Sequence, residues 1–180
     1  MRAAIALAFA AALALMAAPE FARYGAERRV GVATAAFREL VSRENVDLET
    51  ARRIRAVGEL ALSATQSLPG DPRPWMIGAS SYLVTGQPRR ALEFYRAALA
   101  TGERAEVDLN LGRAYARLGQ AEAAEAAYLR AGWVSPEILE TLPEPARRPL
   151  LDRIARLTET LRAGKLPAPP PLPPDSPAAP

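Results

Sequence analysis

Arg113 and Arg117 are the side chains whose types and spacing best suit a binding function. They lie four residues apart, so in a helix their guanidinium groups share one face. Two guanidinium groups at this spacing can bind one carboxylate together, and without an anion their like charges repel. Glu106 and Asn110 precede Arg113 on the same stretch, so the face is polar without being uniformly basic. The pattern predicts a site for an acidic side chain or a free carboxylate of a partner.

Composition argues against catalysis. The 180 residues include no cysteine and no histidine. Thiolate nucleophiles, Ser-His pairs, imidazole or thiolate metal ligands and disulfide bonds are therefore excluded. Ser80 and Ser81 lack the glycines of a nucleophile elbow, and the sequence contains no phosphate-binding loop. We expect a protein that is not an enzyme and that has no metal or cofactor.

Positive charge is spread along the chain. The formal net charge is +3, from 23 basic and 20 acidic residues. Arginine pairs at 28–29, 52–53, 89–90 and 147–148 have glutamates nearby. Such pairs can contact lipid or nucleic-acid phosphates, but interleaved charges are typical of a solvated face. The close acidic pair at 122 and 125 also fits a hydrated face, and we expect no nucleic-acid partner.

Residues 1–22 are apolar enough to interact with a membrane. After Arg2, residues 3–18 are uncharged, and a helix of that length spans roughly 24 Å, compared with a bilayer core of about 30 Å. The run is slightly long for a signal peptide, and continuing it to residue 22 would complete a span. Arginines beyond the run oppose export, but the short amino-terminal tail favours it. We interpret residues 1–22 as a signal peptide or membrane anchor, which predicts a periplasmic or inner-membrane-anchored protein.

Residues 23–71 predict a helical hairpin. Apolar residues recur on one helical face before and after the sequence ENVD; they are Val30, Ala33, Phe37, Leu40 and Val41, then Ile54, Val57, Ala61, Ala64 and Leu68. Asp47 can cap the second helix by accepting hydrogen bonds from its first backbone N–H groups. The sequence LPGDP at 68–72 ends that helix.

An internal repeat with a period of 33 residues follows. The residues that recur at this offset are Tyr82 and Tyr115, Gly86 and Gly119, Ala91 and Ala124, Tyr95 and Tyr128, and Ala98 and Ala131. Small residues allow two helices to approach closely, tyrosines fill the space between them, and the glycines can end the first helix of each unit. Self-similarity at this period is typical of a helical solenoid.

Residues 72–136 resemble two tetratricopeptide repeats. The family pattern adds to those recurring positions a large first residue, a Leu-Gly pair and a closing proline. These are matched by Trp75 in the first unit and by Leu111, Gly112 and Pro136 in the second. The first unit has Gly78-Ala79 in place of Leu-Gly and Glu103 in place of the proline, and the second has Asp108 in place of the large residue. Residues 23–71 fit only as a degenerate hairpin.

The resemblance implies a short solenoid of antiparallel helix pairs that binds a peptide on the first helices of its units. The residues that it places on this face are Met76, Ser80, Leu83, Asn110, Arg113 and Arg117. The face would be apolar at one end and arginine-lined at the other; the alternative is a solvated helix face. Asn110 also occurs in repeats that clamp a C-terminal carboxylate, but Met76 and Ser80 replace that subfamily's Lys and Asn, so we do not expect the clamp.

Residues 137–164 predict a cap on the solenoid. Prolines at 143, 145 and 149 interrupt a third repeat, and a helix with one charged face is expected after Pro149. Residues 165–180 are rich in proline, which predicts an extended, polyproline II or disordered tail. We expect a spacer, the alternative being a ligand of a polyproline-binding domain. Because the tail lacks apolar periodicity, its deletion should leave the fold intact.

These observations predict an all-α protein that binds other proteins. The expected role is an adaptor or assembly factor at the bacterial cell envelope, with a partner polypeptide in the groove of the repeats. The alternative is a structural subunit of an envelope secretion or polysaccharide-export complex.

Overall fold

The computed structural model describes residues 2–42, 45–165 and 169–171, except for the side chains of residues 2–12 and 14. Within these residues the chain is helical and contains no β-strand, which confirms the predicted all-α class. The elements in chain order are α1 (Arg2–Val41), α2 (Leu48–Leu62), α3 (Pro72–Val84), α4 (Pro88–Leu99), α5 (Ala105–Arg117), α6 (Ala121–Val134), the 3-10 helix η1 (Pro136–Thr141) and α7 (Glu144–Arg162).

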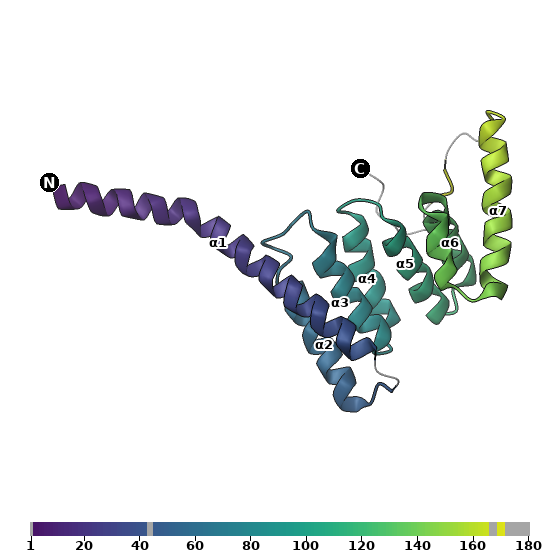
Figure 1. The fold of residues 1–180 in the computed structure, drawn as a ribbon, viewed down its shortest axis with the longest axis horizontal. Helices are drawn as coiled ribbons and strands as arrows, with labels where there is room; N and C mark the ends of the chain where they lie inside the picture. Colours follow the sequence, from purple (N-terminus) through teal and green to yellow (C-terminus); the bar gives the residue numbers. More distant parts are fainter. Residues whose placement is uncertain (1, 43–44, 166–168, 172–180) are drawn as a thin grey trace.

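The helices stack in the order of the chain, as in a helical repeat protein (Figure 1). Each α-helix packs against the next, and α3 also contacts α1 and α5. In the described part of the chain no corresponding contact joins α2, α4 and α6, so the stack is tighter on the side of α1, α3 and α5. We call this side the inner face. At the end of the stack, η1 contacts α5 and α6, and α7 packs on α6.

The helix ends are set by local sequence signals. The Asp47 carboxylate accepts a hydrogen bond from the backbone N–H of Thr50 at 2.7 Å, which is the predicted cap of α2. Gly86 and Gly119 follow α3 and α5 with φ of +78° and +73°, as the repeat pattern predicts. The boundaries of the four repeat helices α3 to α6 therefore agree with the sequence pattern.

Small residues bring the paired helices of each unit together. Ala91 and Tyr95 are fully buried, and Ala124 is 5% exposed. A Cβ atom added at Gly112 of α5 would lie 2.4 Å from the ring of Tyr128 on α6, so only glycine fits this contact without a shift. The expectation that small residues and tyrosines mark the crossings of the helices is confirmed.

The buried apolar residues of the repeats and of the cap form two separate clusters. The first joins α3, α4, α5 and α6 through residues such as Tyr82, Tyr95, Leu111 and Tyr115. The second consists of Leu109, Leu129, Ala131, Leu139, Leu142, Leu150 and Ile154. It fixes η1 and α7 against the last repeat, so the cap is part of the packed structure.

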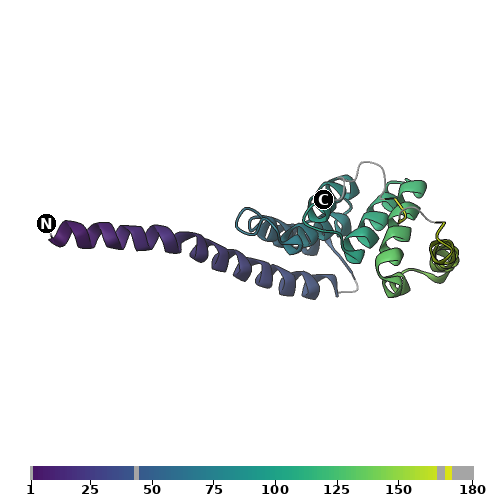
Figure 2. The same ribbon diagram turned by 90° about the horizontal axis from the view of Figure 1, so that it is seen from above.

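The first helix is one continuous element from Arg2 to Val41 and contains Pro19. Its later part packs on the stack through Ala26, Val30, Ala33 and Leu40, whereas its earlier part projects away from the other helices (Figures 1 and 2). Arg73 fixes the junction, because its guanidinium bonds the carboxylate of Glu27 on α1 at 2.7 Å. In the part of the chain that the structure describes, no helix is both long and apolar enough to cross a membrane.

The last helix begins earlier than the sequence predicts. We expected it after Pro149, but α7 starts at Glu144 and includes this proline. Pro145 lies in the first turn, where a missing N–H costs nothing. Pro149 removes one hydrogen bond, and the burial of Leu150 and Ile154 just beyond it compensates for that loss.

Part of the proline-rich tail is packed. The expected extended or disordered conformation of residues 166–168 and 172–180 lies outside the described residues. The intervening segment, residues 169–171, lies against α6, and Pro170 is buried there. The lack of apolar periodicity did not predict this contact.

Candidate functional site

The six residues of the predicted partner site lie on α3 and α5. Met76, Ser80 and Leu83 belong to α3, and Asn110, Arg113 and Arg117 belong to α5. Because α3 and α5 contact each other on the inner face, the structure brings the two sets together.

Arg113 connects the last repeat to the cap. One guanidinium nitrogen donates to the side-chain oxygen of Asn110 at 3.0 Å, and another donates to the hydroxyl of Thr141 in η1 at 2.9 Å. A guanidinium has five N–H donors, so Arg113 keeps donors for a further acceptor. The side chain is held in place by neutral groups, which leave its positive charge uncompensated.

Arg117 connects the two repeats. Its guanidinium donates to the backbone carbonyl of Leu83 at the end of α3. A cation at the carboxyl end of a helix interacts favourably with the helix dipole. The Arg117 side chain thus spans from α5 to α3 on the inner face.

Both guanidinium groups act on the same buried tyrosine. Burial raises the pKa of Tyr95 to about 12 even though a hydrogen bond with Ser80 and the positive charges of Arg113 and Arg117 offset part of the rise. The Ser80 and Tyr95 hydroxyls lie 2.8 Å apart. The Ser80 hydroxyl is therefore engaged with Tyr95 within the protein and is less available to a partner.

The apolar end of the predicted site is mostly part of the core. Leu83 is only 6% exposed, so its side chain packs inside the repeats. Met76 is half-buried and packs against the same cluster while keeping part of its surface accessible. The surface that a partner can reach is therefore dominated by Arg113, Arg117 and the exposed part of Met76.

No carboxylate of the described residues lies within ion-pair distance of Arg113 or Arg117. By contrast, Arg73, Arg130 and Arg153 each form an ion pair. The two arginines on the inner face therefore carry charge that the described part of the protein does not neutralise.

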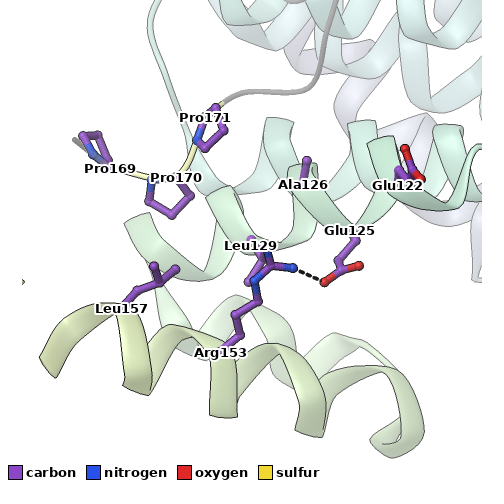
Figure 3. Close-up of a pocket in the computed structure, with 9 residues that line it drawn as sticks. All are labelled: Glu122, Glu125, Ala126, Leu129, Arg153, Leu157, Pro169, Pro170 and Pro171. Atoms are coloured by element: carbon purple, nitrogen blue, oxygen red, sulfur yellow. Dashed lines mark hydrogen bonds and ion pairs between the residues drawn. The ribbon is translucent and has the colours of Figure 1, made fainter. Parts of the chain in front are cut away.

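A second site, which sequence reasoning missed, lies between α6 and α7. A cavity of about 370 Å³ is lined by Glu122, Glu125, Ala126, Leu129, Arg153, Leu157, Pro169, Pro170 and Pro171. In Figure 3 the three prolines and Leu157 lie at one end of the cavity, and Glu122 and Glu125 lie at the other. The Glu125 carboxylate forms an ion pair with Arg153 across the gap between the two helices. None of the six predicted residues lines this cavity.

Arg130 links this cavity to the interior of the second repeat. Its guanidinium forms a two-point ion pair with Glu103, with one N–O distance of 2.6 Å. Another nitrogen donates to the backbone carbonyl of Pro170 at 2.9 Å. The Arg130 side chain is only 12% exposed. A charged donor that is buried and oriented by a carboxylate binds an acceptor strongly.

Asp108 lies near this ion pair and is fully buried. Neither carboxylate oxygen has a hydrogen-bond partner among the residues that the structure describes. The pKa of Asp108 is raised to about 7, mainly by burial and also by the charge of Glu103, while the charge of Arg130 offsets part of the rise. Because a buried carboxylate without a partner is costly, Asp108 is protonated over a wider pH range than an exposed aspartate.

The sequence did contain a signal for this cluster. Glu103 and Asp108 are two of the positions at which the repeats depart from the family pattern, and the structure places both near Arg130. Arg130 and Pro170 are 40 residues apart. Nothing local in the sequence connects them.

The two sites offer hydrogen-bond donors, positive charge and apolar walls. The described residues contain no group of acidic side chains that is suitable for a metal ion. Comparison of the chain with models of protein families, with curated proteins and with solved structures found no match.

Proposed function

We propose that this chain is a tetratricopeptide-like adaptor or assembly factor that binds a partner polypeptide on its inner face. Its 33-residue period and the matched small and aromatic positions support the family resemblance. Stacked helix pairs with a curved inner side provide an extended surface for a polypeptide, and no bound cofactor is required.

The pair Arg113 and Arg117 carries this proposal. Both guanidinium groups lie on the inner face, both act on Tyr95, and no carboxylate of the described residues neutralises them. An anionic partner would relieve the repulsion between them. We therefore propose a partner segment that has an acidic side chain or a free carboxylate. An apolar residue of the same segment, next to this carboxylate, contacts the exposed part of Met76.

We place this activity at the bacterial cell envelope, with residues 1–22 as signal peptide or anchor. Large apolar side chains lie exposed on the projecting part of α1, namely Leu13, Leu15, Met16 and Phe21. Several large apolar side chains exposed on one segment are typical of a surface that a membrane or another protein covers.

A pull-down from detergent-solubilised cells tests the inner face. We expect Arg113→Ala combined with Arg117→Ala to lose the partner that the unmodified chain captures. The matched control removes two arginines from α2, Arg52→Ala with Arg53→Ala, and should retain it. Circular dichroism should show unchanged helicity in both variants. The inner-face variant loses three hydrogen bonds, two of them partly buried, of about 1 kcal/mol each, so its melting temperature should fall by no more than about ten degrees. Undiminished capture by the inner-face variant would contradict the proposal.

A further inference from the structure

Residues 169–171 of the chain's own tail lie in the groove between α6 and α7. The last helix ends in a Schellman turn, in which the backbone N–H of Lys165 donates to the carbonyl of Thr160 at 3.0 Å and Gly164 has φ of +66°. This turn redirects the chain, and residues 169–171 line the cavity on the side of α6 (Figure 3). The tail therefore returns to the body of the protein.

The groove has the chemistry that a proline-rich strand requires. Proline has no backbone N–H, so such a strand presents only carbonyl acceptors and apolar rings. Leu129 and Leu157 supply apolar walls, and Arg130 supplies a buried donor to the carbonyl of Pro170. The ion pair with Glu103 fixes the guanidinium before any strand arrives, so little rotamer entropy is lost on binding.

The three prolines fill only part of the site. A cavity of about 370 Å³ remains beside them. This volume is within the usual size range for ligand pockets, so the groove has room for a strand that follows a longer path along α6 and α7. Pro170 is buried, whereas Pro169 and Pro171 are exposed, so one residue anchors the segment.

We propose that the groove between α6 and α7 is a binding site for extended proline-rich strands and that the chain's own tail occupies it. A ligand that belongs to the same chain as its site has an effective concentration that reaches the millimolar range. The tail therefore excludes a second strand of similar affinity, and its release opens the site. This site lies on a different face from Arg113 and Arg117, and the inference does not depend on the function proposed for them.

Binding of a labelled tail peptide to the full-length protein tests this inference. The probe is a fluorescent peptide with the sequence of residues 166–180, and the readout is fluorescence anisotropy. The full chain with Pro169→Gly, Pro170→Gly and Pro171→Gly has an emptied groove and should bind the probe at least tenfold more tightly than the unmodified chain. A probe whose prolines are replaced by glycine should not bind.

Substitutions in the emptied chain identify the groove. We expect Arg130→Lys to weaken binding of the probe about tenfold, because lysine keeps a charge for Glu103 but lacks the planar guanidinium that reaches Glu103 and the Pro170 carbonyl together. Leu157→Asn on α7 removes an apolar wall without touching the ion pair and should weaken binding severalfold, even if Arg130→Lys impairs folding. Arg162→Gln, which changes an exposed arginine paired with Glu159, should have no effect. Equal affinity for the parent and emptied chains, or binding that Leu157→Asn leaves unchanged, would overturn the inference.

Discussion

In the first repeat Trp75 and Phe94 stack with their ring centroids 6.1 Å apart, whereas the positions 33 residues later hold Asp108 and Ala127. Asp108 and Ala127 are both fully buried. The same pair of positions thus holds an aromatic stack in one unit and a buried carboxylate and a buried methyl group in the next. The backbone of a repeat does not by itself determine what fills the space between its helices.

The difference extends to the surroundings of the two pairs. Phe94 also lies 5.4 Å from the ring of Tyr82, so the first unit has a cluster of three aromatic rings. The second unit instead has the ion pair of Glu103 and Arg130 close to Asp108. Apolar burial stabilises the first unit, whereas the second unit keeps charged groups in its interior at a cost in stability. This second arrangement is also the one that contacts the proline segment.

The largest expected effect on stability comes from enlarging the alanine at which the two helices of each unit cross. Ala91→Trp inserts an indole where the alanine is fully buried and should destabilise the protein by about 3 kcal/mol or more. Ala124→Trp should be less harmful, because Ala124 borders a cavity of about 440 Å³ between α6 and α7 that can accept part of the ring. Thermal melts followed by circular dichroism should show the larger decrease for Ala91→Trp. Equal melting temperatures would mean that the two units pack alike.

An intermediate effect is expected from Asp108 and depends on pH. In the unfolded chain the group has an ordinary pKa near 3.8, whereas burial raises the native pKa to about 7. Between these two pH values Asp108 keeps its proton in the native state and releases it in the unfolded state. The free energy of unfolding therefore falls as the pH rises through this range. Asp108→Asn removes the titration and should be more stable than the parent at pH 8, by about 1–3 kcal/mol.

Urea unfolding of both proteins at several pH values measures this difference. It should shrink toward zero near pH 3, below both pKa values, where the parent is protonated in both states. Other carboxylates contribute equally to both proteins and cancel in the comparison. A difference that stays constant from pH 3 to pH 8 would show that Asp108 does not titrate in this range.

The smallest effect concerns the equivalent tyrosines of the two units. The Tyr82 hydroxyl donates to the carboxylate of Glu59 on α2, and the Tyr115 hydroxyl accepts from Arg96 on α4 at 3.2 Å. Each bond joins a unit to the helix before it, but the partner of Tyr82 is an anionic side chain and the partner of Tyr115 is a cationic one. We expect Tyr82→Phe and Tyr115→Phe each to lower the free energy of unfolding by about 0.5–1.5 kcal/mol, measured by urea unfolding. A loss above about 3 kcal/mol in either variant would indicate a wider network.

Features that depend on neighbouring residues were predictable from the sequence. The cap at Asp47, the turns at Gly86 and Gly119 and the contact between Gly112 and Tyr128 all follow from local patterns or from the 33-residue period. A periodic pattern states which residues face a neighbour, and in a solenoid that neighbour is the next element along the chain.

Features that join distant residues were not predictable. Glu103 and Pro170 lie 27 and 40 residues from Arg130 in the sequence. Nothing in the sequence around an arginine on a helix face identifies a partner at such a distance. The early start of α7 was also missed, because a proline disfavours a helix without forbidding it where packing compensates. The partner contacts of Arg113 and Arg117 stay a prediction.

The projecting part of α1 holds the repeats at a fixed distance from the amino terminus. Packing on the stack begins at Ala26, so about 24 helical residues at about 1.5 Å each separate the start of α1 from the repeats by roughly 36 Å. A continuous helix also transmits rotation, since each residue turns the chain by about 100°. Removing one residue between Pro19 and Gly25 would therefore shorten the reach only slightly but would turn the inner face through about a quarter of a circle relative to whatever holds the amino terminus. The length of this helix sets how far the repeats stand off, and its residue count sets which way they face.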